Sequence, residues 1–228
     1  MFDGHWRKPV DQAMVPIGAA IRRAGVSADA ITITGIAMSA LCAVAIGAGQ
    51  FRVALVLLIL TGVPDALDGA VARAGGGGSK RGAFFDSVSD RFTDAIMFGG
   101  LAWYFAGEGG RVVMLPFALF AAASLISYQR AKAESLGFDA KGGIMERAER
   151  FIVLGVGLLF SELLVGVLWV MLVLSVLTVV QRFVKVWRQA DRPVTPRSRY
   201  RRTRRRTSRP VAERWRTQLA ARRDQRPR

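Results

Sequence analysis

Six apolar blocks between residues 28 and 184 constrain the fold of this chain more than any other feature. Most of them approach the ~20 residues that an α-helix needs to cross the hydrocarbon core of a bilayer. The fifth block is short, and we expect its helix to begin near Ile144 with charged first turns at the membrane interface. The pattern predicts an all-α polytopic membrane protein with six transmembrane helices. These cover residues 28–48, 53–72, 84–106, 112–129, 148–160 and 163–184.

Basic residues predict the orientation of these helices. The connections 72–82 and 130–150 and the C-terminal end are rich in lysine and arginine, whereas 48–52 and 107–111 hold one arginine each. An excess of lysine and arginine marks the cytoplasmic side of a membrane protein. We therefore expect a multi-pass protein of the cell membrane, with both termini and the two basic connections in the cytoplasm.

The two ends of the chain differ from its apolar middle. We expect residues 1–25 to form an interfacial amphipathic helix, residues 26–190 to form the six-helix domain, and residues 191–228 to be a disordered tail. The chain is 51% hydrophobic yet carries a net charge of +16, and arginines of the tail supply much of that charge. A polybasic segment next to a membrane domain is expected to lie on anionic lipid. Nucleic-acid binding is the alternative, and we expect membrane lipids rather than nucleic acid as the partner.

Four aspartates stand where the second and third predicted helices approach the cytoplasm. Asp65 and Asp68 are three residues apart, and Asp86 and Asp90 are four apart, so each pair projects from one helix face. Four consecutive glycines in the connection (75–78) allow a sharp turn that makes the two helices antiparallel neighbours.

Four carboxylates at close quarters require a neutralising cation, and ligand sets made only of carboxylate oxygens select Mg²⁺, Mn²⁺ or Ca²⁺ rather than zinc or iron. The alternative is a set of ion pairs with Arg73, Arg81 and Arg91. Asp94 continues the stripe one turn deeper, where it would orient a ligand or pair with an arginine. Gly69 follows Asp68 inside the helix, which suits either close helix packing or the approach of a flat group.

The stretch from Asp65 to Asp90 reads DALDGAVARAGGGGSKRGAFFDSVSD. It resembles the signature of the CDP-alcohol phosphotransferases, D-x-x-D-G-x-x-A-R, eight residues, G-x-x-x-D-x-x-x-D, and every fixed position is filled at the right spacing. The resemblance covers residues 1–190 and leaves the tail outside. It implies an enzyme, a homodimer, in which an alcohol attacks the diphosphate of a CDP-linked lipid or alcohol and CMP is released.

The same resemblance implies roles for individual residues. Asp65, Asp68, Asp86 and Asp90 would hold two Mg²⁺ ions per site, with Mn²⁺ as a substitute. Asp90 would also be the general base for the incoming hydroxyl. Contacts with CDP-diacylglycerol would come from Asp29, Ala30, Ile31, Thr32, Gly69, Arg73 and Ser79. Asp29 would equally suit the N-terminus of a helix.

Basic side chains near the cytoplasmic ends of the last three helices suggest a second phosphate, on the acceptor. This arrangement resembles the actinobacterial phosphatidylinositol phosphate synthases, which implies 1D-myo-inositol 3-phosphate as the acceptor. The matching positions are Arg130, Lys132, Arg150 and Arg182. Arg130 and Lys132 stand where that subfamily is expected to have lysine and then arginine, which keeps the charge and changes the hydrogen-bonding geometry. We expect Glu146 and Glu149 to pair with neighbouring basic side chains.

Two other functions fit parts of this pattern. A phosphatidylglycerophosphate synthase would use glycerol 3-phosphate, an acceptor that also carries a phosphate. A cation transporter with an acidic vestibule would explain the carboxylates, although these lie at one membrane face rather than near the midplane, where transporter sites lie.

Overall fold

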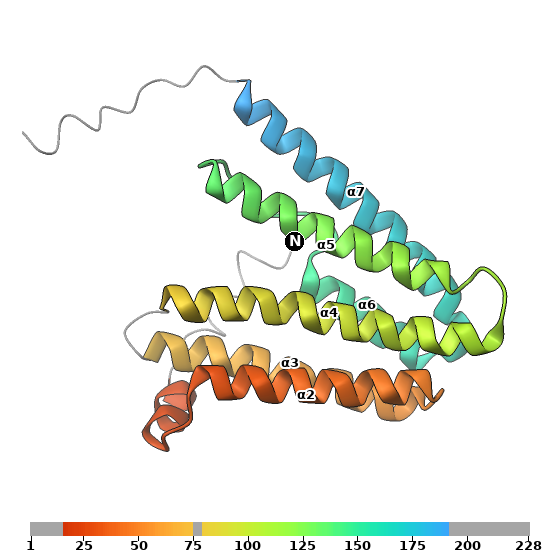
Figure 1. The fold of residues 1–228 in the computed structure, drawn as a ribbon, viewed down its shortest axis with the longest axis horizontal. Helices are drawn as coiled ribbons and strands as arrows, with labels where there is room; N and C mark the ends of the chain where they lie inside the picture. Colours follow the sequence, from red (N-terminus) through yellow and green to blue (C-terminus); the bar gives the residue numbers. More distant parts are fainter. Residues whose placement is uncertain (1–15, 75–78, 192–228) are drawn as a thin grey trace, which may run out of the picture. The chain divides into compact units, whose positions relative to one another are not determined.

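The computed structural model describes residues 16–74 and 79–191, without the side chains of residues 65, 66, 68 and 72–74. This part of the chain is helical and contains no strand (Figure 1), so the prediction of an all-α fold is confirmed. After a short helix over residues 16–23, the helices are α2 (Ala28–Gly47), α3 (Phe51–Ala74), α4 (Lys80–Glu108), α5 (Met114–Ser135), α6 (Arg147–Leu159) and α7 (Leu164–Ala190). A 3₁₀ turn, η1 (Ser161–Leu163), joins the last two.

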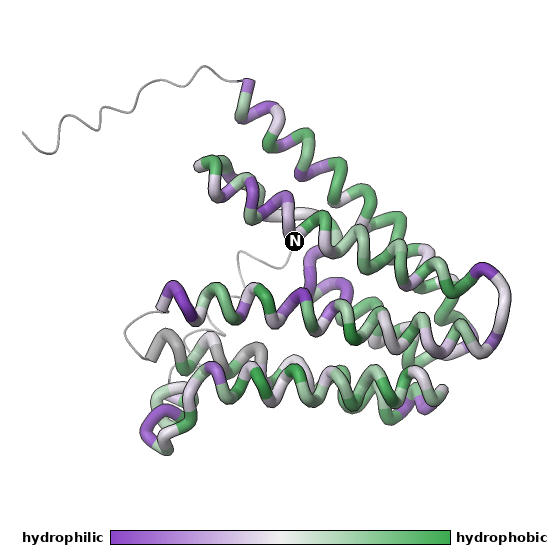
Figure 2. Tube along the Cα trace, viewed as in Figure 1, coloured by the Kyte–Doolittle hydropathy of each residue, from purple (hydrophilic) through white to green (hydrophobic). Residues whose placement is uncertain are grey.

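Each predicted apolar block coincides with one helix. By length and composition, three described segments are able to cross a membrane: Ala28–Gly47, Phe51–Val71 and Ser161–Ala190. Large apolar side chains such as Ile59 and Trp169 are exposed at their surfaces, and Figure 2 shows hydrophobic residues along most of α2 and α7. Exposed apolar surface of this extent fits lipid as the surrounding medium, and the chain is a membrane protein.

The principal helix contacts follow a cyclic order. Helix α2 packs against both α3 and α4, α4 against α5, α5 against α7, α7 against α6, and α6 against α3. The ring brings α6, from the second half of the sequence, beside α3 from the first half. Its core is built of fully buried side chains such as Ile46, Leu101, Leu119, Leu168 and Met171.

Small residues allow α2 to approach its two neighbours closely. A Cβ atom at Gly100 of α4 would lie 2.6 Å from the carbonyl oxygen of Ala43, and a Cβ atom at Gly35 would lie 3.3 Å from the Cβ atom of Pro64. Pro64 lies inside α3, and the absence of a side chain at Gly35 of α2 leaves room for its ring. This contact fixes the turn of α3 that immediately precedes Asp65.

Because successive helices alternate in direction, the starts of α2, α4 and α6 share one end with the ends of α3, α5 and α7 (Figure 1, left). The prediction that the fifth helix begins near Ile144 is wrong, since α6 begins at Arg147. Glu146 has an extended backbone, with a φ of −83° and a ψ of −174°, and forms the N-cap, so the helical conformation begins only after it. The predictions for residues 1–15 and 192–228 lie outside the described residues.

Candidate functional site

A small pocket lies between α2, α3, α4 and α6. Its volume of about 20 Å³ is close to the space that one water molecule requires. A nucleotide would have to lie at its mouth. The lining comprises Thr32, Gly35, Ile36, Thr61, Pro64, Asp86, Ser89, Asp90, Thr93 and Arg147.

Two of the four predicted ligand carboxylates meet in this pocket. Asp86 and Asp90 lie one turn apart on α4, and both contribute to the lining. The Asp90 carboxylate also forms two ion pairs: its Oδ1 is 2.6 Å from Nη1 of Arg147, and its Oδ2 is 3.4 Å from Nη2 of Arg91. The alternative of ion pairing, which the sequence left open, is thus realised at Asp90.

The side chains of Asp65, Asp68 and Arg73 lie outside the described residues. Helix α3 nevertheless runs through all three positions, and Pro64, directly before Asp65, lines the same pocket as Asp86. Among the side chains that the structure describes, no three potential ligands come together as a metal site. Asp86 and Asp90 of α4 line the same pocket as this turn of α3. Their carboxylate oxygens are suitable ligands for a hard divalent cation, because such cations prefer oxygen.

One turn deeper, the buried Asp94 lies among three arginines, of which Arg150 is buried and the other two are partly exposed. Its side chain is 2% exposed, and its carboxylate is 2.9 Å from Nη2 of Arg150, 3.8 Å from Nε of Arg147 and 4.0 Å from Nε of Arg91. Arg150 is itself 3% exposed. A buried carboxylate of this kind holds several guanidinium groups that would otherwise repel one another.

The residues predicted to contact CDP-diacylglycerol lie mainly at helix starts. Ser27, not Asp29, caps α2 by accepting the Ala30 N–H, whereas Asp29 stands in the first turn, 3.6 Å from Arg81. Ser79 caps α4 by accepting the Gly82 N–H. Of the remaining members, Thr32 lines the pocket, Ile31 is buried, and Gly69 is half-buried in α3.

The four predicted acceptor residues divide into two pairs. Arg130 and Lys132 are exposed at the end of α5, and Arg130 pairs with Glu134 at 3.0 Å. Arg150 and Arg182 are both 3% exposed and bond to protein groups. Arg130, Arg150 and Arg182 lie near enough to interact electrostatically.

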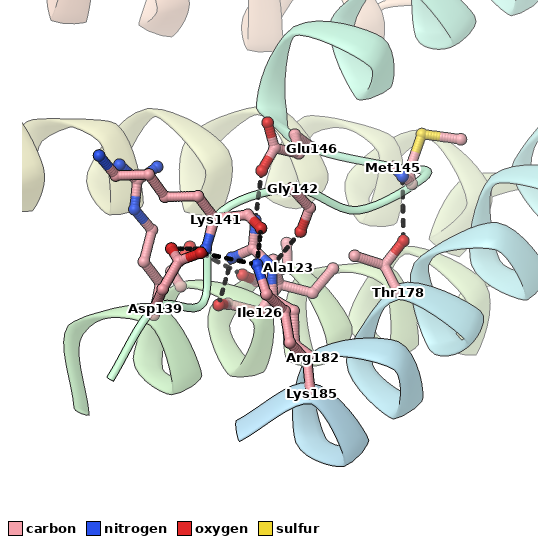
Figure 3. A network of polar contacts seen from close by, with 12 residues as sticks. Ala123, Ile126, Asp139, Lys141, Gly142, Met145, Glu146, Thr178, Arg182 and Lys185 are labelled. Atoms are coloured by element: carbon pink, nitrogen blue, oxygen red, sulfur yellow. Dashed lines mark hydrogen bonds and ion pairs between the residues drawn. The ribbon is translucent and has the colours of Figure 1, made fainter. Parts of the chain in front are cut away.

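Two contacts near the candidate site escaped the sequence analysis. Arg147 was not predicted as a site residue, yet it reaches Asp90 from α6, 57 positions further along the chain. Glu146 was expected to pair locally, but it pairs with Arg182, 36 residues away. A signal for the second contact (Figure 3) was present in the sequence, because Thr178 and Arg182 are polar residues at helical spacing in the last apolar block.

The chain matches the CDP-alcohol phosphatidyltransferase family over residues 26–181. It therefore belongs to this family, and it is a transferase.

Among curated relatives, the phosphatidylinositol phosphate synthase of Mycobacteroides abscessus is 37% identical over 176 residues, which cover 73% of this chain and 80% of that protein. The enzyme of the same name from Cutibacterium acnes is 37% identical over 206 residues, covering 82% and 98%.

Solved structures share the fold, including two of one mycobacterial enzyme. Mycobacterium tuberculosis phosphatidylinositol phosphate synthase (PgsA1) with CDP-DAG bound superposes with a TM-score of 0.71 at 32% identity, covering 77% of this chain and 94% of that one. The same enzyme in complex with manganese and citrate gives a TM-score of 0.70 at 32% identity, covering 76% and 88%.

Proposed function

We propose that this chain transfers the phosphatidyl group from CDP-diacylglycerol to myo-inositol phosphate and releases CMP. The observation that carries the proposal is the meeting of Asp86 and Asp90, from the second half of the signature, with Thr32 in one pocket that is also lined by Pro64, directly before the first half on α3. The relatives named phosphatidylinositol phosphate synthase support the choice of substrates. Membership in a transferase family sets the transporter interpretation aside.

In the proposed reaction, the acceptor hydroxyl oxygen bonds to the phosphorus that carries diacylglycerol, and the bond from that phosphorus to the CMP oxygen breaks. Asp90 takes the hydroxyl proton as the general base. Its position in a pocket lined by three helices other than its own holds its carboxylate in place for this transfer. Arg147, which bonds to Asp90, adds positive charge beside the phosphates.

Divalent cations, two Mg²⁺ per site or Mn²⁺ in their place, would be held by Asp65, Asp68, Asp86 and Asp90. When bound they would offset negative charge on the diphosphate and the leaving CMP. The donor lipid would meet Asp29, Ala30, Ile31 and Thr32 at the start of α2, with Gly69, Arg73 and Ser79 on and after α3.

The acceptor phosphate is proposed to lie against the basic group formed by Arg130, Lys132, Arg150 and Arg182. Arg130 and Lys132 are exposed, and we assign the direct contacts to them first. Arg150 and Arg182 are buried and bonded to protein groups. We propose that they add positive charge to the acceptor site and help to fix its shape.

We also propose that all six helices α2–α7 cross the membrane, with the active site and both termini in the cytoplasm. The basic residues at the shared end of α3, α5 and α7 support this orientation. The helix over residues 16–23 would lie at the interface and the tail on anionic lipid, and the protein would be a homodimer like the related enzymes.

CMP release tests the proposed function. Purified full-length protein in detergent receives CDP-diacylglycerol, Mg²⁺ and one of three acceptors: inositol 3-phosphate, glycerol 3-phosphate or free inositol. We expect CMP only with inositol phosphate. Release only with glycerol phosphate would identify a phosphatidylglycerophosphate synthase, and release with none would overturn the choice of acceptor class.

A further inference from the structure

A cavity of about 620 Å³ lies at the end of the helix ring opposite Asp86 and Asp90. It is bounded by the connection from α2 to α3 and by the turn η1, which joins α6 to α7 (Figure 1), and its lining consists of residues 49–52 and 158–163. Binding sites for small molecules typically have volumes of about 300–1,000 Å³. The cavity is therefore large enough for a ligand, and the proposed reaction makes no use of it.

The first wall of the cavity is held in place by the end of α2. Gly49 has a φ of 71°, and the N–H groups of Gly49 and Gln50 bond to carbonyl oxygens in the last turn of α2, at 2.9 and 2.8 Å. This pair of hydrogen bonds, with glycine in the left-handed conformation, is a common way for a helix to end. Phe51 follows and packs edge-to-face on Tyr104 of α4, with 4.9 Å between the ring centroids.

The second wall, around η1, is held by its buried neighbours. Leu158 before the turn and Leu164 after it are almost completely buried. The N–H of Leu163 bonds to the carbonyl oxygen of Phe160 at 2.9 Å. Both walls are thus formed before any ligand arrives, which reduces the entropy that a ligand loses by ordering its site.

Two opposite charges stand on these walls. Arg52 belongs to the first turn of α3, and Glu162 is the middle residue of η1. Both side chains are exposed, and neither forms an ion pair within the part of the chain that the structure describes. Arg52 offers N–H donors to a phosphate, and the Glu162 carboxylate offers acceptors to an ammonium group. A ligand that carries both charges would satisfy both residues.

The cavity lies at the level where membrane spans end. Of the three segments able to cross a membrane, Ala28–Gly47 ends beside it, while Phe51–Val71 and Ser161–Ala190 begin in its lining. The ends of such segments lie among the lipid headgroups, next to the hydrocarbon core. Leu159 and Leu163 of the lining are 58% and 60% exposed, which suits contact with acyl chains. A ligand that enters from the bilayer at this level is a phospholipid headgroup.

We infer that this cavity binds the headgroup of a zwitterionic phospholipid with a primary amine, as in phosphatidylethanolamine, from the leaflet opposite the Asp86 and Asp90 pocket. The lipid phosphate pairs with Arg52, and the lipid ammonium donates hydrogen bonds to Glu162. The quaternary ammonium of phosphatidylcholine has no N–H to donate. Phosphatidylglycerol satisfies Arg52 but brings a net negative charge beside Glu162.

A headgroup bound in this way connects the start of α3 to the connection between α6 and α7. These segments come from the two halves of the sequence, and α3 and α6 are in contact within the ring. The bound lipid should therefore stabilise the folded state, because a ligand that binds only the folded protein shifts the unfolding equilibrium.

Native mass spectrometry of the delipidated, full-length protein in detergent tests the inference. Phosphatidylethanolamine, phosphatidylcholine and phosphatidylglycerol with the same acyl chains are titrated separately, and the melting temperature is measured with each. Arg52→Gln and Glu162→Gln each remove one of the two charges. Arg111→Gln and Glu108→Gln are the matched controls, since both residues are exposed at the same end of the ring but lie outside the lining of this cavity.

We expect one saturable phosphatidylethanolamine site per chain, with weaker binding of phosphatidylcholine. Each cavity variant should weaken phosphatidylethanolamine binding by about fivefold or more, the order contributed by one charge near a membrane surface. Each should also remove the rise in melting temperature that this lipid causes. Glu162→Gln should improve the binding of phosphatidylglycerol, because the repelling carboxylate is gone. Both control variants should bind like the wild type.

Three results would overturn the inference. The first is equal affinity of the wild type for phosphatidylethanolamine and phosphatidylcholine. The second is wild-type affinity for phosphatidylethanolamine in either cavity variant. The third is an equal loss in the control variants, which indicates general attraction to this end of the protein. If a cavity variant does not fold, the selectivity of the wild type between the two zwitterionic lipids decides. None of these measurements depends on CMP release, so the proposed function and this site can fail separately.

Discussion

Asp94 and Arg150 form an ion pair in which both side chains are almost completely buried, with 2.9 Å between Oδ2 and Nη2. The pair joins α4 to α6 one turn below the proposed catalytic base. Burial of two charges is favourable only when each finds its partner and further hydrogen bonds. Here the Asp94 carboxylate also faces Arg147 and Arg91, both of which lie closer to Asp90, so two carboxylates share three arginines.

Asp94→Asn is expected to destabilise the protein and to lower its turnover. Removing one member of a buried pair typically costs about 3–5 kcal/mol, because the partner charge is left unpaired. Unfolding in detergent, followed by circular dichroism, measures the change. Asp191→Asn, at an exposed position, is the control.

The double variant Asp94→Asn, Arg150→Met should recover part of the lost stability, since it removes one of the unpaired charges. If Asp94→Asn alone unfolds at the wild-type midpoint, the cluster does not hold α4 and α6 together.

Asp90→Asn should abolish CMP release while CDP-diacylglycerol binding stays largely intact. A positioned general base contributes about 100- to 10,000-fold to the rate, and asparagine fills the same space without accepting the proton. Steady-state CMP release and equilibrium binding of the donor are compared, with Glu108→Gln at the far end of α4 as the control. A loss of donor binding as large as the loss of rate would mark Asp90 as chiefly a cation ligand.

The sequence predicts the helices well because length and hydropathy are local properties. It does not predict where α6 begins, because the residues just before α6 contact a distant helix; the Met145 N–H, for example, bonds to Thr178, 33 residues further along the chain. The signature likewise identifies Asp86 and Asp90, which are neighbours on one helix. Arg147 could not be assigned to them, because only the packing of α6 within the ring brings it to α4.

The basic residues show a second limit of sequence analysis. Arg150 and Arg182 look like surface charges on the cytoplasmic side, the usual place for arginine in a membrane protein. In the structure they are buried, and their partners are Asp94, Glu146 and backbone carbonyl oxygens. Charge was predictable, but the direction in which each guanidinium points was not.

Deletion of residues 197–228 is expected to leave kcat unchanged, because the family signature and the pocket lie within the preceding residues. Attachment to anionic lipid should weaken, at ~1 kcal/mol per basic residue near the surface. The contribution of the tail to lipid binding is measured on a soluble peptide of residues 197–228, by flotation with phosphatidylglycerol vesicles and, as the control, with phosphatidylcholine vesicles. A truncated protein without activity would contradict the assignment of the tail to the membrane surface.

Acid should loosen the connection between α5 and α6. The Lys141 N–H and the Lys185 ammonium, which bond to the Asp139 carboxylate, lower the pKa of Asp139 below its ordinary value of 3.8. A carboxyl whose pKa is lower in the folded state stabilises that state above its unfolded pKa, and the contribution disappears as the pH falls through the folded pKa.

Hydrogen exchange over residues 139–145, corrected for the intrinsic rate, should therefore accelerate below about pH 3.8. The effect should be small because Asp139 is exposed. Asp139→Asn should show the faster exchange already at neutral pH and no further acid-dependent step. Identical pH profiles for the two proteins would exclude this contact as the cause.

The central claim is that the carboxylates of α3 and α4 hold divalent cations at the shared end of these helices. Binding of Mn²⁺ to the full-length protein in the presence of CDP, followed by electron paramagnetic resonance, tests it without reference to turnover. We predict two bound Mn²⁺ ions per chain, displaced by Mg²⁺, and loss of binding in the Asp86→Asn, Asp90→Asn double variant. Wild-type protein that binds no Mn²⁺ under these conditions would contradict the account.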